Sequence, residues 1–201
     1  MKQLEPSGQV LSADANHEMA RLLALRSYQL LDTPPNSALD TITQLAARLL
    51  GMPIALVDLV DAERIWSKSH FGTNVTEYQL HPGLCASAIL GDAPYIVNDA
   101  KTDPRTAQHP LIQHNGVGFY AGIPLKTPEN YNIGTLCVID FAPRTLSPAD
   151  IQALQDLAYL AMETIILYAK AQRQHEIAVI ENKFRLNELQ NQLILNSTVE
   201  G

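Results

Sequence analysis

The spacing of apolar residues changes along the chain, and each change predicts a different kind of element. In the ranges 14–30 and 37–49 apolar residues recur at every third or fourth position, which predicts two amphipathic helices. Gly51 is placed to end the second helix. The nearly continuous apolar run 53–60 predicts a buried strand, and 65–71 is expected to be its hairpin partner.

The middle of the chain contains shorter elements separated by turn-forming residues. A short apolar helix is expected at 82–90 and a short strand at 95–97, followed by a turn or short helix that ends near Gly116. Two β-rich runs, 119–125 and 133–139, are joined by a polar segment of hairpin length. About five strands in hairpins, with helices at both ends of the chain, predict an antiparallel sheet with helices packed on it, an α+β fold.

The last quarter of the chain lacks turn formers. All 12 prolines and nine of the 10 glycines lie at or before Pro148. Ser147 and Pro148, followed by Asp150, form a typical helix start, with a capping hydroxyl, a proline in the first turn and an acidic group near the positive end of the helix dipole. One helix can therefore run from 149 to about 196, a length on the order of 70 Å at about 1.5 Å per residue.

The apolar stripe of this helix extends beyond what a single small domain can cover. An exposed apolar stripe needs a partner, and a parallel dimeric coiled coil is the simplest one. The alternative is an amphipathic tail that frays without tertiary contacts. The residues expected at the dimer seam are Val179, Leu186, Leu189 and Leu193.

Charge and cysteine content narrow the classes of function. With 14 basic and 21 acidic residues the net charge is -7, which argues against nucleic acid or an anionic membrane as a direct partner. No secretory signal is recognisable at the N-terminus, and charged residues interrupt every apolar window before the roughly 18 residues that a spanning helix needs. Two cysteines without a CxxC pair do not make a disulfide framework, so we expect a cytoplasmic protein with reduced thiols.

Six sequence blocks, in this order, resemble a known family. They are Leu31-Asp32-Thr33-Pro34-Pro35, Pro53-Ile54-Ala55-Leu56-Val57, Leu84-Cys85-Ala86 with Ala88-Ile89, Asn98-Asp99-Ala100 before Asp103-Pro104-Arg105, Phe119-Tyr120-Ala121-Gly122, and Gly134-Thr135-Leu136-Cys137-Val138-Ile139-Asp140. Together they resemble a GAF domain, and more closely the GAF sensory modules of bacterial histidine kinases and diguanylate cyclases. The resemblance spans 18–168.

The resemblance implies both a fold and a place for a ligand. It implies a GAF/PAS-like central antiparallel sheet of five to six strands flanked by helices, with the terminal helices packed together on one face. On the other face, loops and short helices close over a pocket for a small ligand. Members of the family bind cyclic nucleotides, tetrapyrroles, haem or small metabolites, or serve only as dimerising scaffolds, so the site residues must decide among these.

Eight residues are candidates for the ligand pocket. Trp66 and Tyr78 are expected to form an aromatic wall, and an apolar wall with a few polar groups suits a small metabolite. Asp99 and Asp103 have an equally good interpretation as turn or cap residues, with Arg105 as their surface partner. The full candidate set is Trp66, Tyr78, Cys85, Asp99, Asp103, Arg105, Phe119 and Tyr120.

The two cysteines are first interpreted as buried structural thiols. Cys137 lies in a β-rich run between Leu136 and Val138, where a free cysteine usually behaves as a small buried apolar residue. Cys85 has no cationic neighbour in sequence that would lower its pKa. Domains that attach a bilin resemble one another in a histidine directly after the attachment cysteine, whereas Ala86 and Val138 stand here, so a bilin photoreceptor is not expected. The alternative is the free methionine-(R)-sulfoxide reductase group, which shares the GAF fold and needs an attacking thiolate and a resolving thiol. The segments around the cysteines do not resemble those of that group.

No other motif indicates a cofactor. The six histidines, His17, His70, His81, His109, His114 and His175, are scattered without a metal-ligand spacing, so no metal site is expected. The NKFDE-type motif of cyclic-nucleotide GAF domains has no equivalent here, and there is no P-loop or GxSxG elbow. The identity of any cofactor is left open.

The sequence therefore predicts a non-enzymatic GAF-type sensory domain of bacterial signal transduction, including two-component systems, that binds a small ligand in a cleft and signals through a dimerising C-terminal helix. The alternatives are the reductase and a ligand-free dimerisation scaffold. Expected partners are an unidentified small molecule, a second copy of the chain, and a kinase or cyclase output module in trans, unless the chain is the N-terminal part of a larger protein. The expected organisation is a flexible tail at 1–13, the GAF domain at 14–170 and a helical extension at 171–201.

Overall fold

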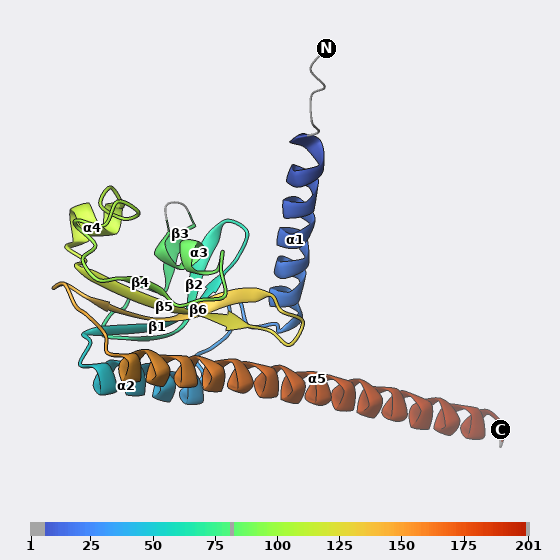
Figure 1. Cartoon of the computed structure of the whole chain (residues 1–201). Coiled ribbons are helices and arrows are strands. Elements are labelled where there is room, and N and C mark those ends of the chain that lie inside the picture. The colour runs from blue at the N-terminus through green and yellow to red at the C-terminus, as the bar shows by residue number, and fades with distance from the viewer. Residues whose placement is uncertain (1–6, 81–82, 200–201) are drawn as a thin grey trace, which may run out of the picture. The chain divides into compact units, whose positions relative to one another are not determined.

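A computed structural model describes the backbone of residues 7–80 and 83–199, and the side chains of residues 15–80 and 83–191. The chain divides into two compact units, Met1–Thr164 and Ile165–Gly201, and the boundary falls inside the last helix. The elements, shown in Figure 1, are α1 (Ser7–Ser27), α2 (Ser37–Leu50), β1 (Ile54–Val60), β2 (Arg64–Phe71), β3 (Glu77–Gln79), α3 (Leu84–Ala88), β4 (Tyr95–Val97), α4 (Pro110–Asn115), β5 (Phe119–Lys126), β6 (Asn132–Asp140) and α5 (Pro148–Val199).

The strands of the first unit form one six-stranded sheet in the order β3-β2-β1-β6-β5-β4. Neighbouring strands pair antiparallel throughout, which confirms the predicted α+β fold. The sequence pattern located five of these strands and missed β3, which has only three residues, two of them polar. The central pair, β1 and β6, sets Leu56 opposite Cys137 and Asp58 opposite Thr135.

The two faces of the sheet are covered by different elements. Successive side chains of a strand point to opposite faces, so the residues of β1 divide between two layers. One face is covered by α2 and the part of α5 up to Thr164, while α3 and α4 lie over the other face (Figure 1). The core on the α3 side includes Leu56, Cys85 and Tyr120. This layer contains the candidate site.

The predicted helix boundaries are confirmed where capping residues mark them. The side chain of Asn36 accepts hydrogen bonds from the backbone N–H groups of Ala38 and Leu39, and Gly51 ends α2 in the left-handed conformation. At the start of α5, the Ser147 hydroxyl accepts from the Asp150 N–H at 3.2 Å, and the Asp150 carboxylate accepts from the Ser147 N–H at 2.9 Å. These reciprocal bonds satisfy backbone groups that the first helical turn leaves unpaired.

The first helix begins earlier than the sequence pattern indicated. Helix α1 starts at Ser7, so residues 7–13, which were expected to belong to a flexible tail, are helical; residues 1–6 lie outside the described residues. The physical reason is that no proline interrupts the chain between Pro6 and Pro34, so the helix can extend toward the N-terminus. The helix is fixed to the sheet by the buried Arg21, which donates to the Val60 carbonyl at 2.7 Å.

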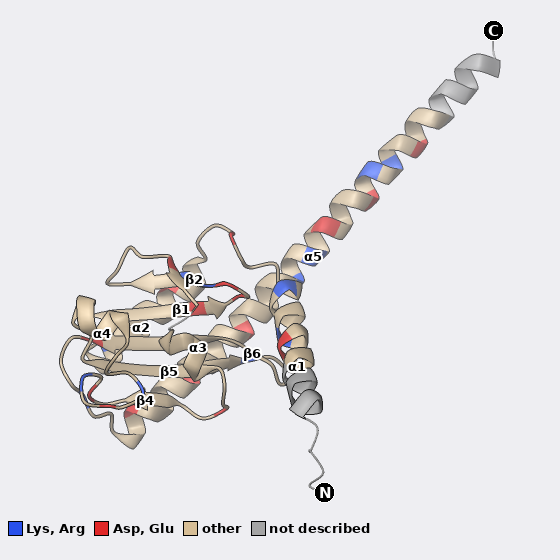
Figure 2. Cartoon of the chain, turned by 90° about the horizontal axis from the view of Figure 1, so that it is seen from above, with Lys and Arg blue, Asp and Glu red and all other residues tan. Residues whose placement is uncertain are grey.

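The second unit is the distal part of α5. Its charged residues are of both signs and are distributed along the helix, as Figure 2 shows. Three of the four seam candidates are exposed, with exposed fractions of 51% for Val179, 62% for Leu186 and 50% for Leu189. The side chain of the fourth, Leu193, lies outside the described residues. Within the part of the chain that the structure describes, no helix is both long enough and apolar enough to cross a bilayer.

Candidate functional site

A cavity of about 200 Å³ lies between the sheet and the elements α3 and α4. Its walls are mostly apolar, because the side chains that point to this face come from buried strands and from two short apolar helices. Few polar groups reach it, and they come from β1, β3, α3, β5 and the start of α4. The lining residues are Leu56, Asp58, Ile65, Tyr78, Gln79, Gly83, Leu84, Cys85, His109, Pro110, Leu111, Tyr120 and Ile139.

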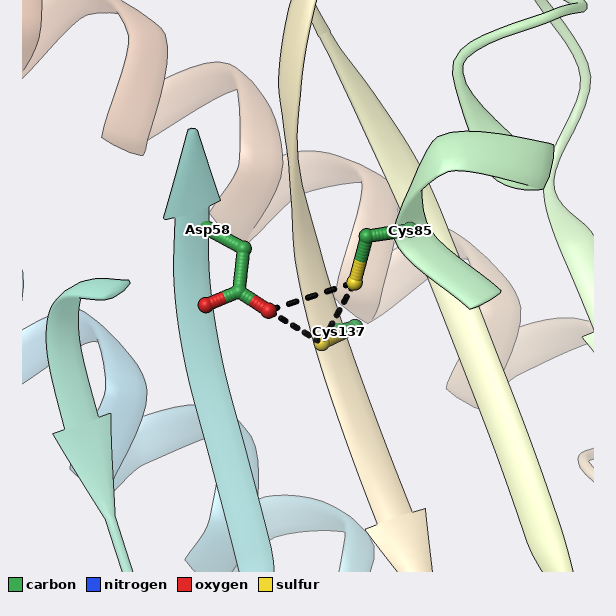
Figure 3. Close-up of side chains that lie close together, drawn as sticks. All are labelled: Asp58, Cys85 and Cys137. Atoms are coloured by element: carbon green, nitrogen blue, oxygen red, sulfur yellow. Dashed lines mark hydrogen bonds between the residues drawn. The ribbon is translucent and has the colours of Figure 1, made fainter. Parts of the chain in front are cut away.

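One carboxylate and two thiols lie close together beside this cavity; Figure 3 shows the three side chains, Asp58, Cys85 and Cys137. The Cys85 thiol donates to Oδ2 of Asp58 at 3.2 Å, and the Cys137 thiol lies 3.8 Å from the same oxygen. The two sulfurs are 4.0 Å apart. Asp58 and Cys85 line the cavity, and Cys137 lies next to them with no exposed surface.

Two hydroxyl groups complete the polar cluster. The Ser67 hydroxyl donates a short hydrogen bond to Oδ1 of Asp58, which leaves Oδ2 directed at the sulfurs. The Tyr120 hydroxyl donates to the Cys85 sulfur at 3.3 Å. Every polar group of the cluster therefore has at least one partner within it, as burial requires.

Burial controls the protonation of this cluster. Desolvation raises the pKa of the Asp58 carboxyl, against the opposing effect of the hydrogen bonds from Ser67, Cys85 and Cys137. The hydrogen bond to Cys85, together with burial, raises the pKa of the Cys137 thiol well above its usual value. Burial likewise raises the pKa of the Tyr120 phenol. Burial therefore favours the proton-bearing, uncharged forms of Asp58, Tyr120 and Cys137.

Three of the eight candidate pocket residues, Tyr78, Cys85 and Tyr120, line the cavity. Two of the other aromatic candidates lie elsewhere. Phe119 precedes Tyr120 on β5 and so points to the opposite face, where it is fully buried. Trp66 is half-buried on β2 and has the Lys68 ammonium over its ring at 5.6 Å.

The three charged candidates form turns and a surface ion pair outside the cavity lining. Asp99 accepts a hydrogen bond from the Lys101 N–H, and Asp103 accepts from the Arg105 N–H. The Arg105 guanidinium pairs with Asp103 at 2.6 Å, and the hydrogen bond between them lowers the pKa of the Asp103 carboxyl. These contacts match the alternative interpretation of the three residues as turn and cap residues with a surface partner.

The most notable cavity residue that sequence reasoning missed is Asp58. In the sequence Asp58 is one of the charged residues that interrupt the apolar windows. A single carboxylate inside an otherwise apolar strand was nevertheless a usable signal, because an ionisable residue is almost never fully buried without a partner. The partners themselves, 27 and 79 residues away, could not be identified from spacing along the chain.

Replacing Asp58 by asparagine is expected to flatten the pH dependence of stability. A carboxyl whose pKa is raised in the folded state stabilises the fold fully below its unfolded pKa of about 3.9, and this contribution is lost as pH rises through the folded pKa. Asparagine is neutral at every pH. The stability of Asp58→Asn relative to the natural chain should therefore increase from pH 4 toward neutrality, as measured by urea unfolding in buffer with EDTA.

Asp103→Asn is a control whose stability relative to the natural chain should change with pH in the opposite direction. Because its pairing with Arg105 lowers the pKa of Asp103, the native carboxylate stabilises the fold above the unfolded pKa, and this contribution disappears as pH falls. The Asp103→Asn chain should lose stability relative to the natural chain at neutral pH and converge with it in acid. If the free energy of unfolding of Asp58→Asn and of the natural chain changed with pH in parallel, the assignment of a raised pKa to Asp58 would be contradicted.

Comparison with known proteins identifies the fold and its family. The model of the GAF domain family matches residues 34–165, which is more than half of the chain. The chain is 34% identical over 173 residues to the cyclic di-GMP phosphodiesterase PA2567 of Pseudomonas aeruginosa, a match that covers 85% of this chain and 30% of that protein. The chain thus spans less than a third of that curated relative.

Solved structures share the same fold at low identity. The GAF domain of a phosphoenolpyruvate-protein phosphotransferase from Coxiella burnetii superposes with a TM-score of 0.57 at 17% identity, covering 78% of this chain and 98% of that one. The type II free methionine-R-sulfoxide reductase of Thermoplasma acidophilum superposes with a TM-score of 0.55 at 17% identity, covering 66% and 92%. The six-stranded antiparallel sheet and the family match over residues 34–165 lead to one conclusion: this chain belongs to the GAF domain family.

Proposed function

We propose that this chain is a sensory module that binds a small ligand in the cavity between the sheet, α3 and α4, and passes the signal on through α5. The observation that carries this proposal is the cavity itself, with its apolar walls and its small group of polar side chains. Such a combination is typical of sites that bind small molecules, because apolar walls supply affinity and a few polar groups fix orientation.

The size of the cavity limits the class of ligand. Pockets for drug-sized ligands measure roughly 300–1,000 Å³, whereas this cavity measures about 200 Å³. A molecule the size of an amino acid fits this space better than a cyclic dinucleotide. The phosphodiesterase activity is named for the whole Pseudomonas protein, and the match covers only 30% of it.

The signal requires an output, and α5 is the element that can carry it. This helix is continuous from Pro148 to Val199 and belongs to both units. Leu154 and Ala158 are buried in the first unit, while Val179, Leu186 and Leu189 of the second unit expose apolar surface. We propose that this surface binds the same helix of a second chain in a parallel dimer, and that a kinase or cyclase module in the cytoplasm reads the state of the dimer.

Native mass spectrometry of protein purified from its own host tests ligand binding. The natural chain should retain a small organic molecule. In Leu111→Trp the larger side chain is expected to extend into the cavity, so occupancy should fall at least about fivefold, because overpacking a filled space typically costs 1–3 kcal/mol. Leu90→Trp is the matched control, because Leu90 is 86% exposed and does not line the cavity. Equal occupancy in all three proteins, or none in the natural chain, would refute the proposal.

The same spectra report the oligomeric state. A dimer mass is expected at micromolar concentration, and a chain carrying both Leu186→Glu and Leu189→Glu should give the monomer mass, because both substitutions put charge at the proposed seam. A monomer mass for the natural chain would remove α5 dimerisation from the proposal without affecting the ligand result.

A second candidate function is reduction of free methionine sulfoxide. The specific observation in its favour is that the two thiols lie 4.0 Å apart, with Cys85 at the cavity. The raised pKa of Cys137 argues against an attacking thiolate at that position, since the thiolate is the nucleophile. Turnover of free methionine sulfoxide with a thiol reductant, lost in Cys85→Ser, would establish the reductase and replace the non-enzymatic proposal.

A further inference from the structure

The donor atoms of Asp58, Cys85 and Cys137 lie within 4.8 Å of one another, and they come from three different elements: β1, α3 and β6. We propose that these three side chains bind one Zn²⁺ ion beside the cavity. This proposal goes beyond the binding of an organic ligand and does not depend on it.

The distances fit a tetrahedral ion. With Zn–S of about 2.3 Å and Zn–O of about 2.1 Å, tetrahedral angles place two sulfurs about 3.8 Å apart and a sulfur and an oxygen about 3.6 Å apart. The two sulfurs here are 4.0 Å apart, and Oδ2 of Asp58 lies 3.2 Å from Cys85 and 3.8 Å from Cys137. Figure 3 shows the three donor atoms facing a common point. An ion can therefore enter with shifts of only a few tenths of an ångström.

The backbone holds the donors in place before any ion binds. Asp58 and Cys137 lie on adjacent central strands, where Leu56 pairs with Cys137 and Asp58 pairs with Thr135. Ser67, on the next strand, donates to Oδ1 of Asp58 and so directs Oδ2 toward the sulfurs. A hydrogen bond that orients a carboxylate ligand in this way typically raises metal affinity 10–100-fold.

The donor types select the metal. Two thiolates favour Zn²⁺ over Mg²⁺ and Ca²⁺, which prefer cages of oxygen ligands. Three protein ligands leave a fourth position, as in catalytic rather than structural zinc sites. Because Asp58 and Cys85 line the cavity, the fourth position faces it, and water or an anionic group of a ligand can occupy it.

The positive charge of the ion also offsets the cost of ionising these buried donors. Asp58, Cys85 and Cys137 are all buried, and buried negative charge is costly unless a positive charge accompanies it. When Zn²⁺ binds, each thiol loses its proton to solvent and its sulfur bonds to the metal, while Asp58 binds as the carboxylate. The two cysteine protons and any proton that Asp58 carries are therefore released to solvent. The affinity of the site for Zn²⁺ should therefore increase as pH rises.

Zinc competition with a chromophoric chelator, on reduced protein previously stripped with EDTA, tests the site. The natural chain should take up one Zn²⁺ per chain. Cys85→Ser, Cys137→Ser and Asp58→Asn should each weaken binding at least about tenfold, since each removes a ligand. Asp99→Asn is the matched control, because Asp99 lies outside the cavity lining and its side chain accepts a hydrogen bond within a turn. The affinity of this variant for Zn²⁺ should equal that of the natural chain.

Cobalt substitution separates metal binding at the thiols from a general loss of folding. The Co²⁺ form of the natural chain and of Asp99→Asn should show a thiolate-to-cobalt charge-transfer band, which each cysteine variant should reduce while its far-ultraviolet circular dichroism stays native. A natural chain that binds less than half an equivalent of Zn²⁺, or folded cysteine variants that bind it undiminished, would overturn the proposal. Retention of an organic ligand by a chain that binds no zinc would leave the sensory function standing.

Discussion

Phe119→Ala is expected to lower the free energy of unfolding by about 3–5 kcal/mol, because removing a buried aromatic ring loses its transfer free energy and leaves a cavity. Phe119 lies on β5 with no exposed surface, on the face opposite the candidate site. Urea unfolding followed by circular dichroism measures the loss. Since folded domains are stable by only about 5–15 kcal/mol, this variant should be one of the least stable single substitutions in the chain.

Phe141→Ala is the matched control for this prediction. Phe141 follows β6 and is 52% exposed, so its truncation should change the free energy of unfolding by no more than about 0.5 kcal/mol. Similar losses in the two variants would show that Phe119 does not pack into the core as the structure describes. The comparison also separates the packing role of Phe119 from the ligand-facing role that its sequence position suggested.

Gly72→Ala is expected to destabilise the domain by about 2–5 kcal/mol, the sum of a conformational cost and a steric cost. Gly72 follows β2 with a φ of +76°, a left-handed conformation that costs a residue with a side chain about 1–2 kcal/mol. In addition, a Cβ at this position would lie 1.8 Å from the Pro53 carbonyl oxygen, so the backbone beside β1 would have to move, and overpacking of this kind costs about 1–3 kcal/mol. The urea concentration at the midpoint of unfolding should therefore be lower for Gly72→Ala than for the natural chain.

Gly51→Ala isolates the conformational part of this effect. Gly51 also has a positive φ, of +60°, but no atom lies within 4 Å of the position that a Cβ would take. Its replacement should therefore cost only about 1–2 kcal/mol. If Gly72→Ala costs no more than Gly51→Ala, the close approach between Gly72 and Pro53 is not a constraint on the fold.

Most elements of this fold follow from local patterns. The periodicity of α2, its stop at Gly51 and the cap at Ser147 are properties of neighbouring residues, and all three are confirmed. The elements that differ from the sequence-based prediction are those whose own residues show no clear periodic pattern. Strand β3 has three residues and depends on pairing with β2 for its conformation, and residues 7–13 join α1 without an apolar pattern of their own.

The candidate site was only partly predictable. Alternation along β5 places one of Phe119 and Tyr120 on each face, but the strand itself does not indicate which of them faces the ligand cavity. The packing of α3 and α4 on one face settles this in favour of Tyr120. Trp66 was misplaced for the same reason, since β2 turns Ile65 rather than Trp66 toward the cavity.

The sequence alone determined the α+β class, the GAF family and the uninterrupted terminal helix, because periodicity, turn formers and motif order are encoded in residues close together along the chain. Only the tertiary structure decided that Asp58, Cys85 and Cys137 share one buried site. Their distances depend on the register of β1 against β6 and on the packing of α3 over both strands. These contacts join residues up to 79 positions apart, and the pattern of any one segment carries no information about them.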